Sequence, residues 1–87
     1  MKLKIFTKVD CPNCPAVKKI GKELEKKGAK IEWHDLDEDE GLSEAVYFDV
    51  LSTPALILLD DSDNEIKAWR GGELPTVELL QNELKIK

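Results

Sequence analysis

The apolar residues of the chain fall into short runs separated by charged or turn-forming residues. Four of these runs predict strands, at residues 1–9, 30–37, 55–59 and 65–70. In the first run Ile5, Phe6 and Val9 are the strongest apolar positions. The third run is apolar without alternation, which is typical of a strand covered on both faces.

Helical spacing predicts three further elements. The first helix runs from Pro12 to about Lys27, with apolar positions on one face and lysines on the other. We expect Cys11 at its N-cap, Pro12 at its first helical position and Gly28 as its stop. Residues 42–48 predict a short helix, and we expect Pro75 to open the last one.

The order of these elements indicates the fold class. A strand–helix–strand unit is followed by a helix, two strands and a final helix, and these apolar faces are buried together only around one mixed sheet. The sequence therefore predicts an α/β domain over residues 1–87, with a four-stranded mixed sheet flanked by three helices in the order βαβαββα.

Composition and charge limit the partners. The net charge of −5 disfavours nucleic acid and anionic membranes. No segment approaches the ~20 apolar residues of a membrane span, and the lysine-broken start does not look like a secretory signal. We expect a cytoplasmic protein and a monomer.

Cys11 and Cys14 are the only two cysteines. In a reducing compartment such a pair is more often redox-active or metal-binding than structural, and a disulfide between them would cross-link almost nothing. A zinc site needs about four ligands, and the chain offers only one histidine besides the thiols, so we expect no metal. A thiol at a helix N-terminus gains thiolate character, which makes Cys11 the candidate nucleophile and Cys14 the resolving thiol.

The chain resembles the thioredoxin fold in its small, glutaredoxin-like form. Three landmarks carry the resemblance: Cys11-Pro12-Asn13-Cys14 after the first strand, Ser52-Thr53-Pro54 before the third, and Gly71-Gly72 after the fourth. Lys8, three residues before Cys11, adds the lysine of the glutaredoxin pattern. The best match is to the small glutaredoxin-like thioredoxins of archaea and bacteria, which reduce protein disulfides.

The resemblance implies roles for several residues. Pro54 is expected to follow a cis peptide bond, and the Thr53 backbone to pair with an extended substrate strand. The other residues expected to contact substrate are Pro12, Asn13, Gly71 and Gly72, and Lys8 is a candidate for tuning the thiolate. Trp69 is expected either at the rim of this groove or in packing.

Two positions depart from the thioredoxin pattern. Ile5 stands where thioredoxins carry a buried aspartate, and Asp10 stands where they carry tryptophan. The proton acceptor for Cys14 is therefore left open, as is the use of glutathione.

The sequence thus predicts a thiol–disulfide oxidoreductase with no bound cofactor, supplied with electrons by an NADPH-linked reductase or a small thiol. Protein disulfides and the reductase are its expected partners. A glutathione-dependent glutaredoxin and a non-enzymatic metal-binding module are the alternatives. We expect His34 to be a surface or half-buried residue without a catalytic role, and Asp60, Asp61 and Asp63 to form a turn rather than a calcium site.

Overall fold

The computed structural model describes residues 1–9, 11, 13–70 and 74–85. Seven elements follow one another along the chain: β1 (Lys2–Thr7), α1 (Cys14–Lys26), β2 (Ile31–Asp35), α2 (Asp39–Tyr47), β3 (Ala55–Leu59), β4 (Glu65–Trp69) and α3 (Val77–Leu84). None of the described helices is long and apolar enough to cross a membrane.

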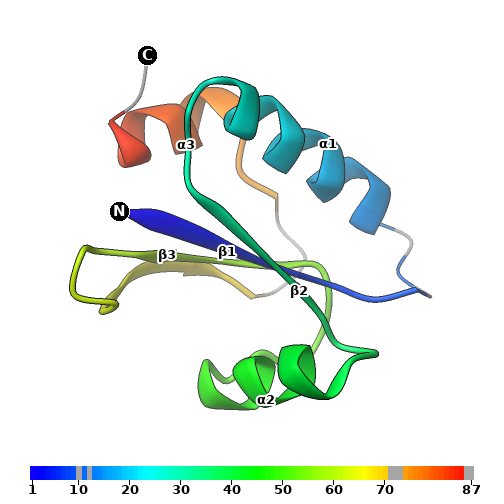
Figure 1. Cartoon of the computed structure of the whole chain (residues 1–87). Helices are drawn as coiled ribbons and strands as arrows, with labels where there is room; N and C mark the ends of the chain where they lie inside the picture. The colour runs from blue at the N-terminus through cyan, green and yellow to red at the C-terminus, as the bar shows by residue number, and fades with distance from the viewer. Residues whose placement is uncertain (10, 12, 71–73, 86–87) are drawn as a thin grey trace.

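The four strands form one mixed sheet in the order β2-β1-β3-β4. β1 runs parallel to β2 and antiparallel to β3, and β3 runs antiparallel to β4. Figure 1 shows α1 and α3 on one face of the sheet and α2 on the other. The predicted fold class and element order are confirmed.

The two faces of the sheet bury two separate groups of apolar side chains. The group under α1 and α3 contains both cysteines and the following apolar residues: Leu3, Ile5, Val17, Leu24, Leu56, Leu58, Leu80 and Leu84. The group under α2 consists of Phe6, Ala45, Val50, Ala55, Ile57 and Leu59. All five residues of β3 are buried, as its unbroken apolar run predicts.

The first strand is shorter than predicted, and one of its strongest apolar positions lies outside it. β1 ends at Thr7, and Val9 lies outside it with 81% of its surface exposed. The backbone N–H of Val9 donates to the carboxylate of Asp37 at 2.8 Å, which ties this segment to the loop after β2.

The start of α1 also differs from the prediction. The helix begins at Cys14 with Asn13 at its N-cap, so Cys11 precedes the cap rather than forming it. Pro15, which lacks an N–H, sits in the first turn, where that N–H would have no helical acceptor. Pro12 lies outside the described residues. At the other end Gly28 adopts a φ of +93°, the left-handed conformation that ends the helix as predicted.

The other two helices begin at different residues than predicted. α2 starts at Asp39 rather than Leu42, because Asp39 and Glu40 favour the positive end of the helix dipole. α3 starts at Val77, and Thr76 caps it by accepting a hydrogen bond from the Leu79 N–H at 3.1 Å, so Pro75 does not open it.

The acidic segment between β3 and β4 is a turn. The carboxylate of Asp60 accepts hydrogen bonds from the backbone N–H groups of Ser62 and Asn64, at 2.8 and 2.9 Å. These bonds lower the pKa of Asp60, with the Asn64 N–H as the largest cause. Asp60 therefore closes the turn itself.

Candidate functional site

The two cysteines lie where the chain passes from β1 into α1, and they form a disulfide with a Cα–Cα distance of 5.2 Å. Cys11 has 7% of its surface exposed and Cys14 has 2%. An attacking Cys11 predicts an exposed sulfur and a resolving Cys14 a sheltered one, but both residues are buried in this oxidised state, with Cys11 the less so.

Two backbone hydrogen bonds link the disulfide segment to the first turn of α1. The Cys14 N–H donates to the Cys11 carbonyl at 3.3 Å, and the Val17 N–H donates to the Asn13 carbonyl at 3.3 Å. The first turn of α1 contains no acidic residue. A thiolate formed at Cys11 would therefore face the positive end of the helix without a carboxylate in that turn.

The sheet brings the Thr53–Pro54 segment to the same edge as the cysteines. Phe6 pairs with Ala55, so the start of β3 lies beside the end of β1. The Thr53–Pro54 peptide bond is cis, and Pro54 is fully buried. The hydroxyl of Thr53 is buried and has no hydrogen-bond partner among the described residues. This edge thus carries a disulfide next to an unused hydrogen-bonding group.

Arg70 fixes the loop that leads into Thr53. Its Nε and Nη2 donate to the Phe48 carbonyl at 3.1 and 2.8 Å, which ties the end of β4 to the end of α2. Its own carbonyl accepts a hydrogen bond from the hydroxyl of Ser52 at 3.4 Å. Sequence reasoning missed Arg70, because nothing in the sequence shows that β4 ends beside α2.

The structure places some of the remaining predicted site residues and does not describe others. Asn13 and Lys8 are exposed, and Lys8 makes no ion pair with any described residue. Trp69 packs against the apolar group that contains both cysteines, so a packing role is established. Pro12, Gly71 and Gly72 lie outside the described residues.

Ile5 is fully buried in the same apolar group as the two cysteines. A carboxylate at this position would be a proton acceptor beneath the disulfide, and isoleucine cannot accept a proton. The one buried charged side chain among the described residues is that of Lys4, which lies on the other face of the sheet with Glu32 and Glu44. Proton transfer to or from Cys14 therefore needs solvent, substrate or a residue outside this group.

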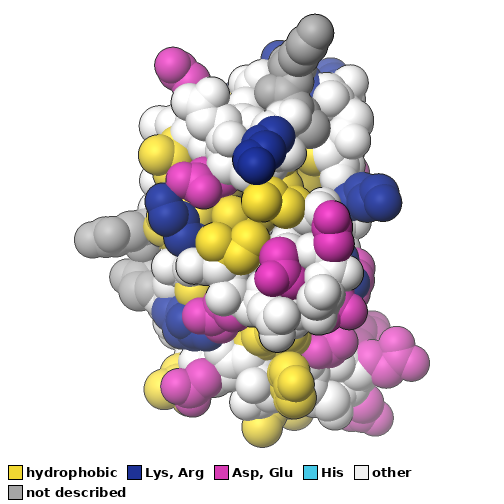
Figure 2. All heavy atoms as spheres, turned by 90° about the vertical axis from the view of Figure 1, so that its left-hand side faces the viewer, with side chains coloured by type: hydrophobic (Ala, Val, Ile, Leu, Met, Phe, Trp, Pro, Cys, Tyr) yellow, Lys and Arg dark blue, Asp and Glu magenta, His cyan; other side chains and the backbone are white. Residues whose placement is uncertain are grey.

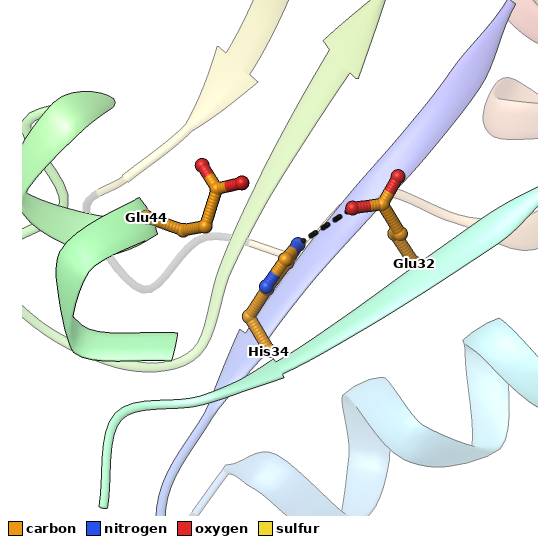
Figure 3. Close-up of side chains that lie close together, drawn as sticks. All are labelled: Glu32, His34 and Glu44. Atoms are coloured by element: carbon orange, nitrogen blue, oxygen red, sulfur yellow. Dashed lines mark hydrogen bonds and ion pairs between the residues drawn. The ribbon is translucent and has the colours of Figure 1, made fainter. Parts of the chain in front are cut away.

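A second group of polar side chains lies on the opposite face of the sheet. Figure 3 shows Glu32 and His34 projecting from β2 toward Glu44 of α2. Their nearest nitrogen and oxygen atoms lie within 4.8 Å of one another, a spacing that a metal ion could bridge. This is the only such group of three among the residues that the structure describes.

The ammonium of Lys4 already fills the centre of this group. Its Nζ lies 2.8 Å from Oε1 of Glu32, 3.2 Å from Nε2 of His34 and 3.3 Å from Oε1 of Glu44. An ammonium has three N–H donors, two of which match the carboxylates of Glu32 and Glu44. Nε2 of His34 lies close to this ammonium and also 3.1 Å from Oε1 of Glu32, so the four side chains form one cluster. The donor set therefore holds the protein's own cation, and we assign no metal site to it.

Aromatic rings and ion pairs stabilise this arrangement. The His34 ring stacks on Phe6 at 5.1 Å, and Lys4 Nζ lies 5.5 Å from the centre of the Phe48 ring. Hydrogen bonds from Lys4, and then from Lys2, lower the pKa of Glu32 to about 2. His34 is half-buried within this group, as the sequence predicts, but its link to Lys4 was not predicted.

Known proteins resemble this chain along most of its length. The family model described as Glutaredoxin matches residues 3–62. A "Probable Thioredoxin" from Archaeoglobus fulgidus is 34% identical over 59 residues, which is 67% of this chain and 65% of that protein. The chain thus spans about two thirds of that relative's length.

Two solved structures show the same fold. Thioredoxin 1 from Thermosipho africanus superposes with a TM-score of 0.65 at 24% identity, over 98% of this chain and 91% of that one. A thioredoxin-like protein from Clostridium perfringens gives a TM-score of 0.75 at 24% identity, over 97% and 68%.

The fold and the disulfide define a thioredoxin-fold protein with a dithiol site. The chain belongs to the glutaredoxin family. Its close cysteine pair, present as a disulfide at the start of α1, indicates thiol–disulfide redox chemistry.

Proposed function

We propose that the protein is a thiol–disulfide oxidoreductase that reduces protein disulfides by cycling Cys11 and Cys14 between dithiol and disulfide. The observation that carries this proposal is the Cys11–Cys14 disulfide at the sheet edge where Thr53 and Pro54 also lie. The larger exposure of Cys11 supports its role as the attacking sulfur.

The reaction has two exchange steps. The Cys11 thiolate attacks one sulfur of the substrate disulfide, forms a mixed disulfide and releases the other substrate sulfur as a thiol. The Cys14 thiolate then attacks the Cys11 sulfur, which forms the Cys11–Cys14 disulfide and releases the second substrate thiol. Two electrons pass to the substrate, and an NADPH-linked reductase or a small thiol returns them to the protein. The protein itself binds no cofactor in this cycle.

The residues around the disulfide would hold the substrate. An extended substrate segment pairs with the Thr53 backbone, as peptides do when they add to a strand edge. Pro12, Asn13, Gly71 and Gly72 complete the proposed contact surface, and Lys8 favours the thiolate of Cys11. The protein acts as a cytoplasmic monomer.

The test uses insulin disulfide reduction with dithiothreitol as electron source. Cys11→Ser should abolish the acceleration over dithiothreitol alone, because no attacking thiolate is left. Cys14→Ser should accumulate a mixed disulfide that a nonreducing gel resolves, because the second exchange step cannot occur. Full turnover by Cys11→Ser would overturn the proposal.

A glutathione-dependent glutaredoxin is the second candidate, and the match of the Glutaredoxin family model over residues 3–62 favours it. Turnover with glutathione and glutathione reductase, compared with turnover by thioredoxin reductase, separates the two. Efficient turnover with glutathione alone would assign the protein to this second class.

A further inference from the structure

The charges of this chain are separated along the sequence. Residues 35–49 contain seven acidic residues and no basic one. The segment that covers α1 and its C-cap, residues 14–27, contains five lysines and two glutamates in a chain of net charge −5. One helix therefore carries a positive charge opposite in sign to the whole molecule.

The fold places these two segments on opposite faces of the sheet. Figure 1 shows α1 on one side of the sheet and α2 on the other. Figure 2 shows acidic side chains from the top to the bottom of the face that it draws, with most of them in its lower half, and Lys and Arg side chains in its middle and upper parts. The protein is thus electrically polarised across its sheet.

Three of the lysines form a stripe that starts next to the disulfide. Lys18, Lys22 and Lys26 recur every four residues, which puts them on one side of α1, and all three are exposed. Lys18 lies four residues after Cys14, a rise of about 6 Å along the helix. We call Lys18, Lys22 and Lys26 the lysine stripe.

The lysines of the lysine stripe form no ion pairs within the part of the chain that the structure describes. None of its members makes an ion pair there, whereas Lys2, Lys4, Lys67 and Arg70 all do. Like charges four residues apart destabilise a helix. Glu25, three residues after Lys22, lies on the same side of α1 and accepts a hydrogen bond from the ring N–H of Trp33. Three lysines and one glutamate leave this side of the helix with a net charge of +2 beside the reacting sulfurs.

On the far side of α1 the charges are balanced. A hollow of about 600 Å³ lies between α1 and α3, with an apolar floor of Ala16, Ile20 and Val77. Two lysines and two glutamates line it as well, so it carries no net charge. The positive potential is thus concentrated on the flank that bears the lysine stripe.

We propose that the lysine stripe is a docking surface for substrate proteins that carry acidic residues beside their disulfide. This inference rests on the proposed function and names the class of substrate that the site prefers. An acidic surface attracted to α1 and repelled from the α2 face brings its disulfide toward Cys11 in one orientation. Neighbouring lysines of the stripe are about 6 Å apart along the helix, within the Debye length of about 8 Å at physiological salt, so they act together on such a surface.

The test uses three synthetic peptides that share one intramolecular disulfide and differ only in four flanking residues, which are Glu, Lys or Ser. Prereduced protein and peptide are mixed, and the rate constant for formation of peptide dithiol is measured. In each turnover the protein dithiol becomes a disulfide while the peptide disulfide becomes two thiols, so the electrons and protons balance. We expect the Glu peptide to react ~10-fold faster than the Lys peptide at low salt, with the difference lost near 0.5 M salt.

Two matched double variants separate the effect of the lysine stripe from the effect of the net charge of the whole protein. Lys18→Glu/Lys22→Glu should remove or reverse the preference for the Glu peptide, measured as the ratio of the Glu-peptide rate to the Lys-peptide rate within each protein. Lys30→Glu/Lys85→Glu makes the same change in net charge at positions away from the disulfide. The backbone carbonyl of Lys30 accepts a hydrogen bond from the Leu3 N–H at the start of β1, and Lys85 follows α3. This control variant should keep the preference.

The outcomes distinguish the two proposals. If the Ser peptide reacts while the three peptides have equal rates, or if both double variants lose the preference equally, the docking surface is wrong and the proposed function stands. If wild-type protein reduces none of the peptides and no insulin, the proposed function itself fails.

Discussion

The guanidinium of Arg70 donates two hydrogen bonds to the backbone carbonyl of Phe48, at 3.1 and 2.8 Å. These bonds join the end of β4 to the end of α2 and brace the loop that carries Thr53 and Pro54. A side chain far from the cysteines in sequence therefore determines how firmly one wall of the redox site is held.

Replacement of Arg70 should weaken both the fold and the site. We expect Arg70→Met to lower the free energy of unfolding by about 2 kcal/mol, because charged hydrogen bonds to a part-buried carbonyl are lost. Insulin reduction should slow as well, since the loop before Thr53 loses its tie. Urea denaturation and turnover assays measure the two effects. The matched control is Lys67→Met, which breaks an exposed ion pair with Glu83 and should cost less than about 0.5 kcal/mol. Equal effects of the two substitutions would contradict the proposed role of Arg70.

Lys4 should be essential to the polar group under α2. Its side chain is buried, and its removal leaves two carboxylates facing each other across His34. We expect Lys4→Met to cost about 2 kcal/mol in urea denaturation at neutral pH, because the carboxylates lose their charge partner. The double variant Lys4→Met/Glu32→Gln should recover part of that loss. A single variant as stable as the wild type would show that Lys4 contributes nothing.

Stability should decrease in acid through Glu32. Its pKa in the folded protein is about 2, below the ordinary value of 4.5, chiefly because Lys4 donates to it. A depressed carboxyl pKa stabilises the fold above pH ~4.5, and this contribution is lost as the pH falls toward 2. Because the side chain is partly exposed, solvent screening limits the effect to about 1 kcal/mol. Urea midpoints between pH 2 and 6 should fall less steeply in Glu32→Gln, and parallel curves would refute the assignment.

Gly41 should tolerate no larger residue. A Cβ at this position would overlap the backbone oxygen of Asp35, so α2 would have to move away from β2. We expect Gly41→Ala to cost more than about 2 kcal/mol. Gly28→Ala is the control, because its added Cβ meets no atom within 4 Å and only the positive φ opposes it, at about 1 kcal/mol. Thermal and urea unfolding compare the two, and a smaller loss at Gly41 than at Gly28 would contradict this packing.

The N-cap of α3 offers a simpler measurement. Thr76→Ala removes the acceptor of the Leu79 N–H and should cost about 1 kcal/mol. Thr76→Ser keeps a hydroxyl acceptor and should restore most of that stability. If the alanine and serine variants unfold alike, the hydroxyl does not cap the helix.

The order of the elements could be predicted from the sequence, because each element has a local pattern of apolar residues. The unbroken run of β3 and the helical spacing of α1 are local properties, and both elements lie where the pattern predicts them. The ends of the elements follow less directly from the sequence. The pattern predicts Cys11 at the N-cap of the first helix, but the helix begins at Cys14 because Pro15 fits the first turn and Asn13 occupies the cap.

The charged group under α2 could not be predicted, because its members come from three segments. Glu32 and His34 share one side of β2 by alternation, which was the only sequence signal. Lys4 joins them only because β1 pairs with β2 in the register that sets Lys4 beside Glu32. A shift of one residue would turn this lysine to the other face of the sheet.

The cysteine pair and its place between a strand and a helix can be read from the sequence alone, because both depend only on local patterns of residues. The surroundings of the pair come from the tertiary structure. Strand pairing brings Pro54 to their edge of the sheet, and Arg70 braces the loop before it. The packing of α1 and α2 on opposite faces turns a charge pattern along the chain into a polarised molecule, because only the fold converts distance in sequence into distance in space.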